Sequence, residues 1–285
     1  MRPLSTQVKE TIQGFYDEYP FPGKLGAYGP WREQAPALLR ASGIDPESAH
    51  GARVLDAGCG TGEYSRSFAA LGAEVLALDV SEGALSLARA HDKELGLSGV
   101  EYRAADVLTL DVDGTFDFVV SLGVLHHTAN PEGGFRNLAP LVKPGGHLVV
   151  GLYSSVSRLH ILALRQFLRV VSLGNRERAI SIAQRWLRPI LPLFVGREGA
   201  TDRRRIADLL ANPHEMPVSL YDALKWFKAA GFEVVACSPS DDPAEYGLIH
   251  WVARKRGGWL SCLLIQLRWV LWNADYYVIT GRRTD

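Results

Sequence analysis

A glycine-rich run, VLDAGCGTG at Val54–Gly62, constrains this chain more than any other feature of its sequence. An apolar stretch ends in Asp56, and three glycines then stand at alternate positions before a helical pattern begins at Glu63. Glycines at a strand-to-helix turn let the backbone turn tightly and approach a ligand closely, and the amino end of the helix can hydrogen-bond an anionic group. The run therefore predicts a nucleotide-type ligand at the end of a strand.

The spacing of the glycines narrows the choice of ligand. A dinucleotide fold uses G-x-G-x-x-G, whereas here the third glycine comes one residue early and Glu63 follows it. No GK[ST] follows, which excludes a P-loop. Because Asp56 would attract an ammonium group and repel a phosphate, the run favours an amino acid joined to a nucleoside.

Residues 51–153 alternate short β-branched runs with helical patterns, which is typical of a parallel sheet covered by helices. Between the strands, helices are predicted from Glu63 to about Leu71 and from Glu82 to Leu95, with Ser81 as the cap of the second. The pattern predicts a doubly wound α/β core. Its five strands are expected at Arg53–Asp56, Glu74–Asp79, Val100–Ala104, Phe116–Leu122 and His147–Tyr153.

Two further acids stand at the ends of the second and third predicted strands. Asp79 can accept hydrogen bonds from ribose hydroxyls, as the acid at this point does in dinucleotide folds. Asp106 can accept a hydrogen bond from an adenine amino group. Either acid alone would more often be a loop or cap residue, but three acids at consecutive strand ends beside a glycine loop favour a nucleoside site.

The segments on either side of this core differ from it in pattern. Phe15–Trp31 is rich in glycine, proline and aromatic residues and predicts an arm or lid with little regular structure. Leu159 to about Leu210 predicts two or three helices interrupted by Pro189 and Pro192. We therefore divide the chain into an arm or lid (1–50), a core (51–153), a helical cap insertion (154–215) and a part that completes the sheet (216–285).

The last part returns the chain to the sheet. An amphipathic helix is predicted at Ser219–Ala230, ended by Gly231, and a strand at Phe232–Ser238. The final strand is expected at Tyr276–Arg282, with Gly247–Arg254 as the alternative.

The whole chain has no net charge, but its charged residues are unevenly distributed along the sequence. With 31 basic and 31 acidic residues, the chain lacks the basic excess usual in proteins that bind nucleic acid, which argues against a nucleic-acid partner. Residues 151–212, in contrast, hold eleven arginines, no lysine and four acids. These arginines either face an anionic acceptor or form solvated and ion-paired helix faces. Arg158, Arg165 and Arg169 recur at near-helical spacing and are candidates for one shared face.

Cysteine usage and hydropathy bear on the compartment. Cys59, Cys237 and Cys262 are far apart and form no CxxC motif, so reduced thiols, a cytoplasmic location and no metal cluster are expected. The opening residues show no signal-peptide pattern. The apolar stretch Trp259–Trp272 is too short to span a bilayer, which leaves contact with a membrane surface open, and the oligomeric state also stays open.

Five motifs taken together resemble the successive motifs of the class I S-adenosylmethionine-dependent methyltransferases, a resemblance that covers residues 51–153 and, more loosely, 219–237 and 275–283. They are VLDAGCGTG, ALDVS (Ala77–Ser81), AADVL (Ala104–Leu108), FDFVVSLGVLHHT (Phe116–Thr128) and LVKPGGHLVVGLY (Leu141–Tyr153).

The resemblance implies a Rossmann-like, mostly parallel seven-stranded sheet with an antiparallel final strand. It also implies S-adenosylmethionine as the cofactor and S-adenosylhomocysteine as the product. In this family the glycines would frame the methionine end, and the three acids would hold its amino group, the ribose and the adenine. The implied cofactor-binding residues are Asp56, Gly58, Gly60, Gly62, Asp79, Val80, Asp106, Val107 and Ser121.

Candidate bases and acceptor contacts lie beyond the carboxyl ends of the strands, where open α/β sheets bind ligands. His126 and His127 follow the fourth predicted strand, and His214 stands beside Glu215 where the cap rejoins the sheet. Each histidine could instead pack, cap a helix or bond a carbonyl. The candidate acceptor contacts are Tyr16, Tyr19, Tyr153, Arg158 and Arg165.

The predicted function is methyl transfer to an oxygen or nitrogen of a small-molecule acceptor, which the arginines would allow to be anionic. SLGV follows the fourth strand where base-amine methyltransferases carry a tetrapeptide like N-P-P-Y, which argues against a nucleobase amine. Two alternatives stay open: methylation of a macromolecule or a lipid headgroup, and a cofactor-binding regulatory protein without turnover.

Overall fold

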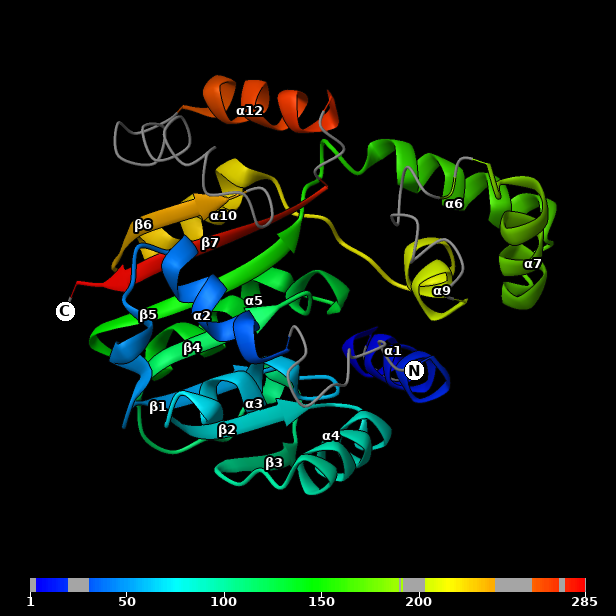
Figure 1. Cartoon of the computed structure of the whole chain (residues 1–285). Helices are drawn as coiled ribbons and strands as arrows, with labels where there is room; N and C mark the ends of the chain where they lie inside the picture. Colours follow the sequence, from blue (N-terminus) through cyan, green and yellow to red (C-terminus); the bar gives the residue numbers. More distant parts are fainter. Residues whose placement is uncertain are drawn as a thin grey trace.

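The computed structural model describes residues 4–19, 31–189, 191, 203–238, 258–271 and 275–284. A seven-stranded sheet runs through the centre of the molecule (Figure 1) in the order β3-β2-β1-β4-β5-β7-β6. β7 runs antiparallel to both of its neighbours, and the other pairs are parallel. The predicted doubly wound, mostly parallel sheet with an antiparallel final strand is confirmed.

The strands begin and end close to the predicted residues. β5 is the exception, since it starts at Val142 rather than His147. Val142 pairs with Phe116 and His147 with Phe118, so residues 143–146 form an irregularity within the strand, in which Gly145 has a φ of +76°. The strands are β1 (Arg53–Ala57), β2 (Glu74–Asp79), β3 (Val100–Ala104), β4 (Phe116–Leu122), β5 (Val142–Tyr153), β6 (Phe232–Ser238) and β7 (Tyr276–Arg283).

The helices that flank the sheet begin and end at residues that favour helix termini. Ser81 accepts a hydrogen bond from the Ala84 amide at 3.0 Å and so caps the next helix, as predicted, and Gly96 ends it in the left-handed conformation. The helices packed on or near the sheet are α2 (Trp31–Ala41), α3 (Glu63–Ala70), α4 (Glu82–Leu95), α5 (Pro131–Leu138), α10 (Leu220–Ala229) and α12 (Trp259–Leu271).

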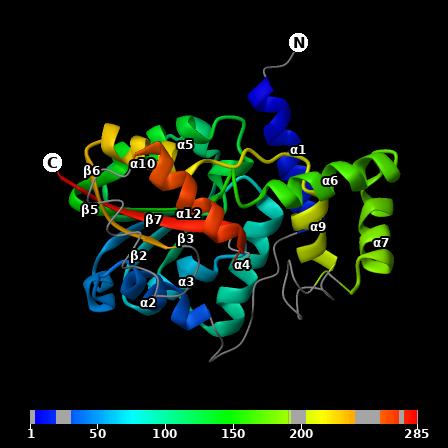
Figure 2. The same cartoon turned by 90° about the horizontal axis from the view of Figure 1, so that it is seen from above.

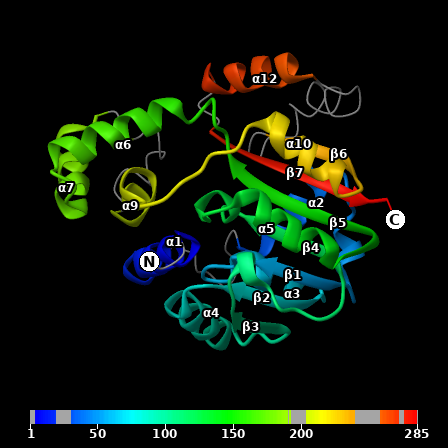
Figure 3. The same ribbon diagram turned by 180° about the vertical axis from the view of Figure 1, so that it is seen from behind.

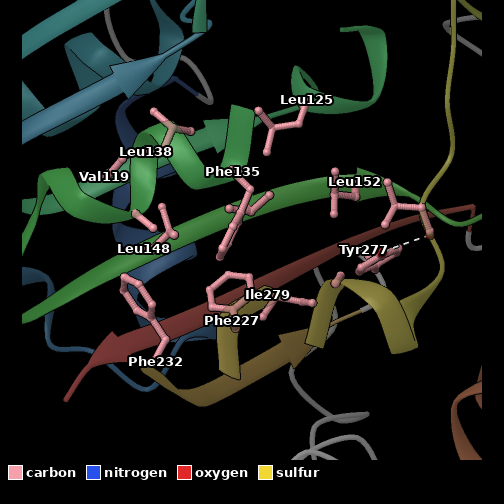
Figure 4. Close-up of a cluster of buried hydrophobic side chains, with 14 of the residues drawn as sticks. Val119, Leu125, Phe135, Leu138, Leu148, Leu152, Phe227, Phe232, Tyr277 and Ile279 are labelled. Atoms are coloured by element: carbon pink, nitrogen blue, oxygen red, sulfur yellow. Dashed lines mark hydrogen bonds between the residues drawn. The ribbon is translucent and has the colours of Figure 1, made fainter. Parts of the chain in front are cut away.

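Successive side chains of a strand point to opposite faces of the sheet, so alternate residues of the strands pack into two separate cores. Val54 and Val149 pack on one face with α2 and α3. Leu55 and Leu148 pack on the other face with α5, α10 and α12. Figure 4 shows the second core, where Phe135 of α5 and Phe227 of α10 lie over β5 and β7.

A third core belongs to the cap. Helices α6 (Leu159–Val171), α7 (Arg176–Trp186) and α9 (Arg203–Ala211) pack together with α1 (Leu4–Glu18). In Figures 1 and 3, α1 lies between α9 and α4, to one side of the sheet. The N-terminal helix is therefore part of the cap as well as of the surface that covers the sheet edge.

The predicted arm needs a correction at both of its ends. Phe15 lies in the last turns of α1, and Trp31 is the first residue of α2, while residues 20–30 lie outside the described part of the chain. The reason is the buried stripe Ile12, Phe15 and Tyr19, which gives α1 a packing face at helical spacing.

In the C-terminal part, β7 occupies the final strand that was predicted at Tyr276–Arg282. The alternative strand at Gly247–Arg254 lies outside the described residues. The apolar stretch that begins at Trp259 forms α12, and among the described residues no helix is long and apolar enough to cross a membrane.

Candidate active site

A cavity of about 480 Å³ opens at the carboxyl ends of β1, β2 and β4, at the edge where the sequence predicts the ligand. Residues from the glycine loop, from the segments after β3 and β4, and from α1 form its walls. Of the predicted site residues, ten line it: Tyr16, Asp56, Gly58, Gly60, Asp79, Val80, Asp106, Val107, His127 and Tyr153.

The glycine loop is fixed by the end of β2. The amides of Gly58 and Cys59 both donate to the carbonyl of Leu78, at 2.7 and 2.9 Å. Gly58 has a φ of +92°, and a Cβ there would overlap the side chain of Val124. Only glycine fits at this position, so the loop can stay close to the cavity without a side chain in between.

Backbone amides orient the two acids at the β2 and β3 ends. Asp79 accepts from the Gly60 amide at 2.8 Å and from the Ser81 amide at 2.9 Å. Asp106 accepts from the Leu108 amide at 2.9 Å, and its other oxygen lies 3.4 Å from the ammonium of Lys9 in α1. Both carboxylates are thus held at the cavity wall, one tied to the glycine loop and one to α1.

Asp56 is buried in the cavity wall. Burial raises its pKa to about 6, opposed by the 2.5 Å hydrogen bond from the Ser65 hydroxyl and reinforced by the charge of Asp79. Burial also raises the pKa of Asp79. A cationic ligand group near these two acids would favour their ionised forms.

The charges of the described cavity lining are mostly negative. Lys9 is the one lysine or arginine among the lining residues that the structure describes. The cavity therefore favours a positively charged ligand. The acids that line it are Asp56, Glu63, Asp79, Asp106 and Asp208.

The part of the cavity beyond β4 and β5 carries different groups. The sheet order places β4 and β5 on the opposite side of β1 from β2 and β3, so His127 and Tyr153 lie across the glycine loop from Asp79. Tyr16 donates to Asp208 at 3.0 Å and accepts from Asn212 at 3.2 Å. This end of the cavity combines aromatic rings with one carboxylate and one imidazole.

The hydrogen bond of His127 fixes its tautomer. Its Nδ1 lies 3.0 Å from the carbonyl oxygen of His214, and because a carbonyl only accepts, Nδ1 carries the proton and Nε2 is the acceptor. Burial lowers the pKa of His127, so the ring is neutral at pH 7. A neutral imidazole with a free lone pair on Nε2 can take up a proton.

Seven predicted site residues lie outside the described lining, and most are committed elsewhere. Tyr19 donates to Glu177 of α7, Ser121 donates to the Ala57 carbonyl at 2.9 Å, and Gly62 caps α3. Direct contact with a ligand in the cavity is not supported for these residues or for the remaining four, which are His126, Arg158, Arg165 and His214.

The arginines predicted to contact the acceptor instead hold a buried carboxylate. Arg158 and Glu215 are both about 1% exposed and form two hydrogen bonds, at 2.5 and 3.1 Å. Arg165 pairs at 2.5 Å with Oε2 of Glu215, the oxygen that also accepts the longer bond from Arg158, and Arg158 also pairs with Asp275. Arg169, in contrast, is exposed. The charges of Arg158 and Arg165 are thus paired inside the protein. This agrees with the ion-paired alternative that the sequence left open, and not with contact to an anionic acceptor.

Sequence reasoning missed several lining residues. Lys9 and Ile12 come from α1, whose apolar positions at helical spacing could have revealed it. Asp208 and Tyr276 reach the cavity from α9 and β7, and no local pattern marks either of them, because their position depends on how the cap and the last strand pack.

Comparison with known proteins agrees with this geometry. A family model described as a methyltransferase domain matches residues 55–150. A ubiquinone biosynthesis O-methyltransferase of Chromobacterium violaceum is 30% identical over 190 residues, which cover 65% of this chain and 79% of that protein. Its counterpart in Xanthomonas euvesicatoria pv. vesicatoria is 40% identical over 116 residues, covering 40% of this chain and 48% of that enzyme.

Among solved structures, PKMT2 from Rickettsia typhi superposes with a TM-score of 0.66 at 15% identity, over 93% of this chain and 56% of that one. At this identity the likeness shows the fold. The chain spans about half the length of the Xanthomonas and Rickettsia proteins. Since the match to the Chromobacterium enzyme extends over more than three quarters of that protein, and the motifs and sheet order agree with it, the chain belongs to the class I S-adenosylmethionine-dependent methyltransferase family.

Proposed function

We propose that this chain binds S-adenosylmethionine in the cavity and methylates a hydroxyl oxygen of a small aromatic acceptor, with His127 as the general base. The observation that carries the proposal is the fixed tautomer of His127, a cavity-lining residue whose Nδ1 proton is held by the His214 carbonyl. A hydroxyl must lose its proton as it is methylated, and a neutral imidazole can accept it.

The described residues fit the cofactor. Asp56 is a buried carboxylate with a raised pKa, and the ammonium of a methionyl group would supply the positive charge it lacks. Asp79 would accept from ribose hydroxyls while its amide bonds keep it in place, and Asp106 with the Val107 amide would face the adenine. Gly60 leaves open space where a ligand backbone would pass, since a Cβ there would meet nothing within 4 Å.

The chemistry divides between cofactor and protein. When bound, S-adenosylmethionine supplies a methyl group activated by its sulfonium charge, and the leaving group is a neutral thioether. His127 takes the acceptor proton on Nε2 as the new carbon–oxygen bond forms. The hydrogen bond from Tyr16 to Asp208 joins α1 to α9 at the cavity wall beside His127, and these elements would orient the acceptor and limit the access of water.

Three observations support methylation of a hydroxyl on a planar acceptor over methylation of an anionic one. The walls near His127 include the rings of Tyr16, Tyr153 and Tyr276, which suit the face of an aromatic ring. The charged side chains of the described lining are mostly acids, which disfavours a carboxylate or phosphate on the acceptor. The similar Chromobacterium and Xanthomonas proteins are named as O-methyltransferases.

An acceptor screen tests this proposal. The full chain is incubated with S-adenosylmethionine and matched pairs of compounds that carry a phenolic hydroxyl, an aliphatic amine or a carboxylate on the same ring, and S-adenosylhomocysteine is quantified. We expect acceptor-dependent turnover with phenols. Turnover only with amines or carboxylates would contradict the oxygen assignment, and bound cofactor without turnover on any acceptor would favour the regulatory alternative.

A further inference from the structure

The exposed apolar side chains of this protein are concentrated in two places. The structure describes thirteen large apolar side chains as exposed, and eleven of them lie on α6, α7 and the turn between them or on α12. Leu173 is 84% exposed, Phe167 59% and Trp259 61%. Such clustering differs from the scattered exposed residues normal in soluble proteins and indicates an interaction surface.

Helix α12 is apolar on both of its faces. Cys262, Ile265 and Trp269 are buried against the sheet core. Leu260, Leu264 and Leu267 follow the opposite helical stripe and are exposed. A helix that packs one apolar face and leaves a second one uncovered has an unpartnered surface.

Helix α6 repeats this arrangement on the same side of the molecule. Ile161 and Leu168 are buried in the cap core, whereas Leu159, Phe167 and Val170 are exposed. In Figure 1, α12 lies at the top of the molecule and α6 at the upper right, and in the view from above in Figure 2 no other labelled helix covers either of them. We call the exposed apolar residues of α6, the turn after it and α12 the apolar border.

The charges around the apolar border are mostly basic; Glu177 of α7 is also exposed, but it pairs with Arg203. Neither α6 nor α12 contains an aspartate or glutamate. Arg169 of α6, Arg178 and Arg185 of α7, and Arg268 of α12 are exposed. Apolar and aromatic side chains flanked by arginines match a lipid surface that carries negative headgroups.

From this match we infer that the apolar border binds the surface of a bilayer containing anionic phospholipids. The protein would lie on the bilayer and not cross it, since no helix among the described residues is long and apolar enough to span one. Its apolar side chains would enter the interface while the arginines pair with headgroup phosphates. This inference concerns a surface outside the cavity and does not depend on the acceptor.

Vesicle flotation tests the inference. The full chain is mixed with vesicles of phosphatidylcholine alone or of phosphatidylcholine with phosphatidylglycerol. We expect binding to the anionic vesicles that weakens as salt rises. The double variants Phe167→Ser with Val170→Ser and Leu260→Ser with Leu264→Ser should each lower the partition coefficient about tenfold or more.

Leu87→Ser is the matched control, because Leu87 is an exposed leucine of α4, away from the apolar border. It should bind vesicles like the wild type, and circular dichroism should show all variants folded. Absence of binding to anionic vesicles, or an equal loss in the control, would overturn the inference. So would sedimentation data in which the border variants dissociate a dimer while vesicle binding is unchanged, since the occupant would then be a second copy of the chain.

Discussion

Replacing Glu215 by alanine is expected to lower the free energy of unfolding by about 3–5 kcal/mol. The Glu215 side chain is about 1% exposed and lies between Arg158 and Arg165. Its removal leaves the fully buried Arg158 guanidinium with Asp275 as its remaining carboxylate partner. A buried charge that loses its partner is costly because the interior cannot replace the hydration given up on folding.

The same pair of arginines controls the protonation of Glu215. Burial alone would raise its pKa, but the hydrogen bonds and charges of Arg158 and Arg165 lower it. The folded pKa therefore lies below the unfolded one, so this stabilisation is present at neutral pH and is lost as the pH falls through the acidic range.

Urea denaturation followed by fluorescence measures this effect. Glu132→Ala is the matched control, because Glu132 pairs with Arg136 on the exposed surface of α5 and its removal should cost less than about 1 kcal/mol. Equal losses for the two variants would show that the buried cluster does not stabilise the cap. The free energy of unfolding measured here does not depend on vesicle binding or on the identity of the acceptor.

Replacing His127 by asparagine is expected to lower kcat by roughly 100- to 10,000-fold, the range for loss of a general base. Asparagine can still donate to the His214 carbonyl that His127 contacts at 3.0 Å, but it has no basic nitrogen. The affinity for S-adenosylhomocysteine should change little, because the acids that would hold it lie on the other side of the glycine loop.

Initial rates of S-adenosylhomocysteine formation at saturating substrates give kcat for this comparison. His147→Asn is the control, since His147 stacks on Phe118 within the sheet and is not part of the described lining. Retention of the wild-type rate by the His127 variant would remove it from the catalytic step. Loss of rate in the variant together with loss of cofactor binding would indicate a structural role.

The core of the fold could be predicted from the sequence because its signals are local. The strand at Val100–Ala104 and the helix at Glu82–Leu95 have the predicted bounds, since β-branched runs, the Ser81 cap and Gly96 each act within a few residues. The start of β5 at Val142 could not be predicted, because Gly145 and Gly146 suggest a turn, and it is the pairing of Val142 with Phe116 ahead of these glycines that lengthens the strand.

In the candidate site, too, some residues could be predicted from local sequence and others could not. Asp56, Asp79 and Asp106 follow directly from their places at strand ends, and the structure puts all three in one cavity. The side-chain contacts of the cap cannot be predicted from the local sequence pattern. Arg158 and Arg165 have the spacing of a substrate-facing helix surface, but their partner Glu215 stands about 50 residues further along the chain, and such pairing is visible only in three dimensions. The four-part division of the chain stays a prediction.

Calorimetric titration of S-adenosylhomocysteine into the wild-type chain and the Asp79→Ala variant tests whether this cavity is the cofactor site. The wild type should bind one equivalent, and the variant should lose roughly 1–3 kcal/mol of binding free energy, as expected when a buried hydrogen-bond partner is removed. Asp111→Ala removes an exposed acid outside the described lining and should bind like the wild type. No binding by the wild type, or wild-type affinity in a folded Asp79 variant, would show that the cofactor does not bind at Asp79 in this cavity.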